Sequence, residues 1–175
     1  MWVDRYAPKS ESELVGNRNV IANFKHWLKD WEDVIMRGHK KKVEYKGKKA
    51  PPNLNARACL ISGSPGIGKT SAVRIVSKEL GFHCFELNAS DIRSKLKIEA
   101  MLTDLSKSNS ITAMIKNAKD GDKPWSLEGK TLILMDEVDG VGAGDRGGLP
   151  ALIKIIKLSK MPIVCIANDI GNRKI

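Results

Sequence analysis

The chain has 175 residues, with 30 Lys and Arg against 20 Asp and Glu, and therefore a formal net charge of +10. This length suits one domain, and the basic balance favours a polyanionic partner, although an ordinary basic surface gives the same count. No apolar run is long enough to cross a membrane and no apolar signal region opens the chain, so we expect a soluble, intracellular protein without a membrane partner. Three widely spaced cysteines in apolar runs indicate core residues in a reducing compartment, not a disulfide or metal framework: Cys59, Cys84 and Cys165.

The first third of the chain begins with an irregular stretch and continues into a helical pattern. Residues 2–9 combine two aromatic residues with a proline and show no helical period, which predicts an extended arm. Residues 10–16 predict a short turn or helical piece that ends at glycine. A helix is then predicted from Asn17 or Asn19 by apolar residues at spacings of three and four: Ile21, Phe24, Leu28, Trp31 and Ile35, with Trp27 beside them.

Residues 37–57 interrupt this pattern with eight basic residues against one acid, Glu44. Two glycines and two prolines in the same stretch oppose regular structure, so we expect a mobile surface insertion. Contact with DNA phosphates and a plainly solvated basic loop are both compatible with this composition.

The remaining segments alternate between strand and helix patterns. Apolar runs predict strands at residues 58–62, 82–87, 130–135 and 162–167. Helices are expected at residues 71–81, at about 92–105 after a helix-start signal at 88–91, and along a stripe that contains Leu149, Leu152, Ile153 and Ile156, with a glycine-rich loop at 140–148. This alternation predicts a three-layer α/β fold, in which a parallel sheet with right-handed crossovers is flanked by helices.

Between the first of these strands and its helix lies a phosphate-binding signature, G-x-x-x-x-G-K-T at residues 63–70. Glycines let the backbone direct its N–H groups at phosphate oxygens, and the start of the following helix favours the same anion. Lys69 is expected to reach the β- and γ-phosphates, and the Thr70 hydroxyl to ligate Mg²⁺; a glycine-rich turn that matches by chance is the alternative. The predicted phosphate-binding residues are Gly63, Ser64, Pro65, Gly66, Ile67, Gly68, Lys69, Thr70 and Ser71.

Polar side chains follow two later strands. Asp136 and Glu137 come directly after an apolar strand, at the end where open α/β sheets bind ligands. Asp136 is predicted to hold Mg²⁺ and Glu137 to orient and polarise the attacking water. Asn168 follows the last strand and is predicted to hydrogen-bond the γ-phosphate or the water, although an Asn-Asp pair is also a common turn.

These three elements in this order resemble the Walker A, Walker B and sensor 1 motifs of the AAA+ ATPases, a family of P-loop NTPases. Residues 85–91 (FELNASD) with the following Arg93 and Lys95 resemble the clamp-loader signature within that family, and residues 2–8 (WVDRYAP) resemble its adenine-pocket arm. Residues 135–140 (MDEVDG) and 144–148 (GDRGG) are similar to the large-subunit family of eukaryotic replication factor C.

The resemblance implies a nuclear ATPase that uses ATP and Mg²⁺ to load a ring-shaped sliding clamp onto primer–template DNA, in a hetero-pentamer with small replication factor C subunits. It implies an adenine pocket at Val3, Tyr6, Pro8, Val15 and Gly16. It also implies DNA-phosphate contacts at Arg93, Lys95 and Arg146, for which a solvated cap cluster is the alternative at Arg93 and Lys95.

Two features depart from the family pattern. The clamp-binding stretch corresponds to Ile111, Met114 and Ile115 and lacks the usual aromatic pair, so weaker or shifted clamp contact and ordinary helix packing both remain open. The chain also stops just past sensor 1, so we expect a fragment or a short gene model that lacks the helical lid. Its expected parts are an arm at residues 1–16 and an ATPase core at residues 17–175. We expect the arginine finger to be supplied in trans. The alternatives are a non-catalytic nucleotide-binding adaptor and the large subunit of an alternative or checkpoint clamp loader.

Overall fold

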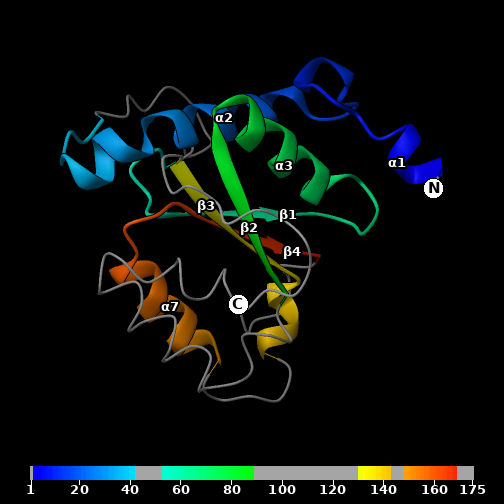
Figure 1. The fold of residues 1–175 in the computed structure, drawn as a ribbon. Helices are drawn as coiled ribbons and strands as arrows, with labels where there is room; N and C mark the ends of the chain where they lie inside the picture. The colour runs from blue at the N-terminus through cyan, green and yellow to red at the C-terminus, as the bar shows by residue number, and fades with distance from the viewer. Residues whose placement is uncertain (1, 42–52, 89–129, 143–147, 169–175) are drawn as a thin grey trace, which may run out of the picture.

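The computed structural model describes residues 2–41, 53–88, 130–142 and 148–168. Its centre is a four-stranded sheet in the order β1-β4-β3-β2, and every pair of neighbouring strands is parallel. The strands are β1 (Ala58–Ser62), β2 (Phe82–Asn88), β3 (Lys130–Asp136) and β4 (Ile163–Ala167). All four lie where the sequence predicts strands, which confirms the parallel α/β sheet (Figure 1).

The two central strands explain why their sequences are continuous apolar runs. In β3 the four residues 132–135 are buried, and in β4 all five residues are buried. Strands covered on both faces cannot alternate between polar and apolar residues. The parallel register also places Ser62 beside Ala167 and Met135 beside Cys165, so the ends of β1, β4 and β3 meet at one edge of the sheet.

Two helices cover one face of the sheet. They are α2 (Arg18–Trp31), which continues into the π-helical turn η2 (Glu32–Met36), and α3 (Lys69–Glu79). The predicted stripe on α2 is confirmed, because Phe24, Leu28 and Trp31 are buried in one cluster with residues of α3, β3 and β4. The indole N–H groups of Trp27 and Trp31 donate to the carbonyls of Ala56 and Arg57, each at 2.8 Å, so the buried tryptophans have no unsatisfied donors.

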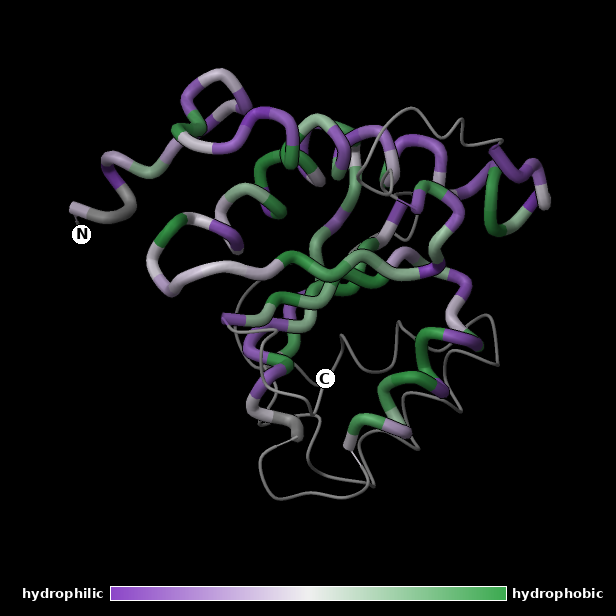
Figure 2. Tube along the Cα trace, turned by 180° about the vertical axis from the view of Figure 1, so that it is seen from behind, coloured by the Kyte–Doolittle hydropathy of each residue, from purple (hydrophilic) through white to green (hydrophobic). Residues whose placement is uncertain are grey.

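The other face carries α7 (Gly148–Leu158) and the 3₁₀ helix η3 (Val138–Gly142), which completes three layers (Figure 1). Leu152 and Ile155 of α7 are buried against β3 and β4, but Ile153 is 50% exposed. The predicted stripe was therefore wrong at Ile153, because the face that meets the sheet passes through Ile155 instead. Residues 140–142 were expected to belong to a glycine-rich loop, but they form the end of η3. Figure 2 shows the apolar strands between the two helical layers.

The start of the chain corrects a second expectation. Residues 2–5 were predicted to be extended, but they form one helical turn, α1 (Trp2–Arg5). The Tyr6 N–H donates to the Trp2 carbonyl at 3.1 Å, and the two rings stack with centroids 5.6 Å apart. One turn is too short to show a helical period, which is why the pattern missed it. The helical piece predicted next is confirmed as the 3₁₀ helix η1 (Glu11–Glu13).

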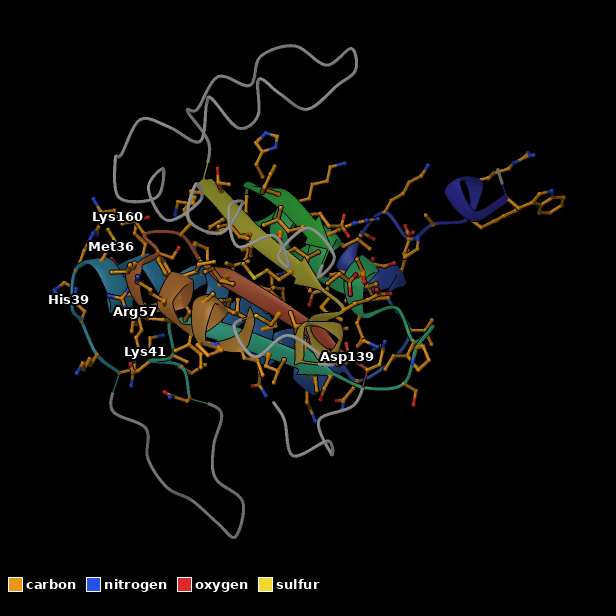
Figure 3. The ribbon with its side chains drawn as sticks, turned by 90° about the horizontal axis from the view of Figure 1, so that it is seen from below. Met36, His39, Lys41, Arg57, Asp139 and Lys160 are labelled. Atoms are coloured by element: carbon orange, nitrogen blue, oxygen red, sulfur yellow. The ribbon has the colours of Figure 1, made fainter. Side chains whose placement is uncertain are left out.

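The ends of the predicted basic insertion lie together. The backbone N–H and carbonyl of Lys41 both bond to the side chain of Asn55, each at 2.8 Å. Figure 3 shows His39, Lys41, Arg57 and Lys160 at the end of the molecule opposite to Asp139. Residues 42–52 and the helix predicted at about 92–105 lie outside the described residues. Within the described part, no helix is both long and apolar enough to span a membrane.

Candidate nucleotide-binding site

The phosphate-binding loop begins at the end of β1 and closes against the end of β4. The Gly63 N–H donates to the Ala167 carbonyl at 3.3 Å, which ties the loop to the neighbouring strand. Gly68, directly before α3, has a φ of 85°, a left-handed conformation that side chains disfavour. A Cβ on Gly63 would stand 2.7 Å from Cδ1 of Ile67. The loop's conformation therefore favours glycine at position 68, and a side chain at position 63 would require the end of the Ile67 side chain to shift.

Lys69 joins this loop to the end of β4. Its Nζ donates to the carbonyls of Gly63 at 2.7 Å and Ser64 at 2.9 Å, and to Oδ1 of Asn168 at 2.9 Å. An ammonium group has three donors, and these oxygens account for all of them. The arrangement holds the positive charge at the mouth of the loop, where phosphate oxygens are equally suitable acceptors.

Thr70 and Asp136 meet across the gap between α3 and β3. The Thr70 Oγ1 donates to one carboxylate oxygen of Asp136 at 2.7 Å, and the Glu137 N–H donates to the other at 2.9 Å. A hydroxyl and a carboxylate are hard oxygen ligands of the kind that Mg²⁺ uses together with substrate phosphates. No group of three or more His, Cys, Asp or Glu side chains that can hold a metal occurs among the described residues. The pair therefore fits a metal that a phosphate helps to ligate.

Glu137 and Asn168 complete the predicted catalytic residues. Glu137 has a φ of 56°, and within the described ranges no other residue except glycine has a positive φ. Such strain is concentrated at functional sites. The Asn168 N–H donates to Oδ2 of Asp139 at 3.2 Å, so the loop after β3 also fixes the end of β4. Lys69 and Asn168 are thus in contact across 99 residues of sequence, and Thr70, the residue after Lys69, contacts Asp136 across 66.

A cleft of about 570 Å³ extends from the loop to the N-terminal arm. The arm contributes Tyr6, Pro8, Val15 and Gly16, all of which the sequence assigns to an adenine pocket. The phosphate-binding loop and α3 contribute Gly66, Ile67, Gly68, Lys69 and Ser71. The structure therefore places these nine predicted residues in one cleft, whereas Gly63, Ser64, Pro65 and Thr70 do not line it. The side chain of Val3 lies outside the described part.

Several lining residues were missed by the sequence analysis. Ile21 and Phe24 of α2 line the cleft, although their spacing indicated only a core stripe. The stripe both packs in the core and lines the cleft, because α2 passes from the sheet to the arm. Further lining residues are Glu13, Leu14, Asn17, Val20, Ile61, Ser62, Ala72 and Val76. No sequence signal marked them, because their position depends on how α2 packs beside α3.

Six predicted contact residues lie outside the described part of the chain and stay predictions. They are Arg93, Lys95 and Arg146 for DNA, and Ile111, Met114 and Ile115 for the clamp.

Comparisons with known proteins agree with this geometry. The model of the "ATPase family associated with various cellular activities (AAA)" matches residues 59–172. "Replication factor C subunit 1" of Oryza sativa subsp. japonica is 43% identical over 99% of this chain and 17% of its own length. The Homo sapiens protein of the same name is 35% identical over 100% of this chain and 15% of its own length. These similarities confirm the resemblance to replication factor C large subunits.

A relative outside the eukaryotes and a solved structure extend the comparison. "Replication factor C large subunit" of Methanococcus aeolicus is 36% identical over 97% of this chain and 29% of its own length. A structure of C. elegans PCH-2 matches with a TM-score of 0.53 and 17% identity, over 88% of this chain and 38% of that one. The structural likeness shows the fold alone. The chain spans less than a third of the length of each of these replication factor C relatives.

Proposed function

Given that the chain belongs to the AAA ATPase family, we propose that it is the ATP-binding and ATP-hydrolysing module of a DNA sliding-clamp loader. Similarity to replication factor C subunit 1 along 99% of the chain supports the clamp-loader assignment. One structural observation supports the nucleotide assignment most directly. A single cleft joins the arm residues to Lys69, and the next residue, Thr70, bonds to Asp136.

The proposed substrate is ATP with Mg²⁺. The apolar wall formed by Tyr6, Pro8 and Val15 holds the base, and the P-loop N–H groups with Lys69 bind the phosphates. Thr70 and Asp136 would hold Mg²⁺, which would supply positive charge opposite the transferred phosphoryl group.

Two side chains act on the attacking water and the γ-phosphate in this proposal. Glu137 orients the water and accepts its proton. The Asn168 side chain hydrogen-bonds the γ-phosphate or the water. Because Asn168 already contacts Lys69 at 2.9 Å, it lies at the phosphate end of the site. An arginine supplied by a neighbouring subunit completes the stabilisation of the charge on the transferred phosphoryl group. Hydrolysis by the isolated chain is therefore slow.

The proposed partners are the small replication factor C subunits, the sliding clamp and primer–template DNA in the nucleus. Arg93, Lys95 and Arg146 contact DNA phosphates, which carry no sequence information and therefore suit a loader that acts at any junction. Ile111, Met114 and Ile115 contact the clamp.

The test is steady-state ATP hydrolysis by this chain with the small subunits, the clamp and primer–template DNA, beside the full-length rice large subunit. We expect DNA and clamp to stimulate turnover. If the rice protein is stimulated while this chain stays at background, the chain is not a competent loader subunit.

Glu137→Gln separates an ATPase-driven loader from a non-catalytic adaptor. The substitution removes the group that accepts the proton of the attacking water and keeps the size of the side chain. A loader with this substitution therefore binds ATP but does not release the clamp. An adaptor keeps its full activity with this substitution, and that result would contradict the hydrolytic role.

A further inference from the structure

We propose that Glu11, Lys25 and Glu79 form a latch that positions the N-terminal arm for recognition of the nucleotide base. The inference rests on the proposed function, since it assumes that the cleft binds a nucleotide. None of the three residues belongs to a motif in the sequence. They lie in three separate elements, η1, α2 and α3, which Figure 1 shows on the same face of the sheet.

The contacts of the latch are specific. The Glu11 N–H donates to Oε1 of Glu79 at 2.7 Å, across 68 residues of sequence. The Lys25 ammonium donates to the Glu11 carboxylate and, at 3.2 Å, to Oε2 of Glu79. One lysine therefore bridges two carboxylates that would otherwise repel each other. The backbone bond to Glu79 adds a direct tie between the arm and α3.

The electrostatics favour the charged form of the latch. The hydrogen bonds that Lys25 donates to the Glu11 and Glu79 carboxylates raise the pKa of Lys25 above its usual value. The Glu11 N–H and then Lys25 lower the pKa of Glu79. Lys25 and Glu79 are thus held in the ionised state in which their hydrogen bonds are strongest.

The arm is folded as a unit on the side of this latch. The Lys9 N–H donates to Oε2 of Glu13 at 2.9 Å, and the Glu13 N–H donates to the Ser10 carbonyl at 3.2 Å. Directly after η1, Leu14 lines the base cleft and also a second cavity of about 580 Å³ that Glu11 and Glu79 line. Ile21 is shared by the two cavities in the same way. The latch therefore lies directly behind the wall of the base cleft.

The helix α3 connects the latch to the phosphates. Its first residue is Lys69 and its last is Glu79, so one rigid element carries a phosphate ligand at one end and the anchor of the arm at the other. The latch therefore fixes the base-binding residues relative to the phosphate-binding residues. Opening it is expected to weaken binding of the base while binding of the phosphates is unchanged.

The experiment compares the dissociation constants of the chain for Mg-ADP and for inorganic pyrophosphate with Mg²⁺, by calorimetric titration. Lys25→Met removes the bridging charge, and we expect ADP to bind about fivefold more weakly, as for the loss of a small ion-pair network. Pyrophosphate should change by less than about twofold because it has no base. Lys25→Arg keeps the charge and should restore the affinity for ADP.

Two further variants provide a control and an independent test of the latch. Lys29→Met changes a lysine one turn further along α2 and should leave both constants unchanged. Glu79→Gln removes the negative charge on α3 that Lys25 bridges, and should repeat the selective loss even if Lys25→Met does not fold, as judged by thermal unfolding.

Three results overturn the latch. Unchanged ADP affinity in Lys25→Met and Glu79→Gln contradicts it while the proposed function stands. Equal losses of ADP and pyrophosphate affinity show a merely structural role. If the wild-type chain binds neither compound, the proposed function fails and the latch fails with it.

Discussion

At the phosphate end of the cleft, Lys69, Thr70, Asp136 and Asn168 are joined by side-chain hydrogen bonds of 2.7 to 2.9 Å. At the base end, Tyr6 is 68% exposed and Val15 is 97% exposed. The first region is built on the ends of parallel strands whose residues are buried in the core. The second is built on an arm that reaches α3 through surface ion pairs. The difference teaches that the proposed phosphate site is preorganised by the sheet, whereas the geometry of the proposed base site depends on how the arm docks.

The largest expected effect is at the phosphate end. Lys69→Ala removes three charge-assisted donors, so the affinity for Mg-ADP should fall about 300-fold. Calorimetric titration measures the change. Lys78→Ala in the last turn of the same helix is the control and should bind normally. A loss of less than about threefold for Lys69→Ala would mean that the loop does not cradle phosphates.

Asn168→Ala separates catalysis from binding in the same region. Because Asn168 contacts Lys69 only through its side chain, ADP affinity should stay within about twofold while the single-turnover hydrolysis rate falls about 100-fold, as for the loss of one polar group at a transition state. Rapid-quench measurements with the partner subunits test this. Equal effects on binding and rate would make Asn168 a ligand-binding residue only.

At the base end, Tyr6→Ala should weaken ADP about fivefold by removing apolar surface from the cleft, and leave pyrophosphate binding unchanged. Trp2→Ala is the matched comparison, because Trp2 stacks on Tyr6 but does not line the cleft. Its effect should be smaller. A larger effect of Trp2→Ala would show that the stack, and not the Tyr6 ring alone, forms the base pocket.

The smallest effect concerns two thiols within the strands that lead to the phosphate end, Cys59 of β1 and Cys165 of β4. Burial raises the pKa of Cys59 to about 11 and that of Cys165 to about 12, so both stay neutral in the folded chain near neutral pH. In the unfolded chain these thiols ionise near pH 9. Stability should therefore be unaffected below pH 9 and should fall as the pH rises toward 11. Thermal unfolding between pH 8 and 10.5 measures the decline, and Cys165→Ala should reduce its slope.

Much of the site could be predicted because its signals are local. The P-loop pattern fixes Lys69 and Thr70 one residue apart, and the apolar runs place Asp136 and Asn168 at the ends of adjacent strands. The contact of Asp139 with the Asn168 N–H was not predictable, because it depends on the path of η3. The α1 turn was missed because four residues are too few to show a period.

The sequence by itself determined the strands, the G-x-x-x-x-G-K-T loop and the residues proposed as catalytic groups, because these follow from backbone preferences and apolar runs within short segments. Only the tertiary structure decided that Ile155 faces the core, that Ile21 and Phe24 line the cleft, and that Glu11 meets Lys25 and Glu79. These contacts join residues up to 68 positions apart. They arise from the way helices pack on the sheet, and local patterns carry no information on that packing.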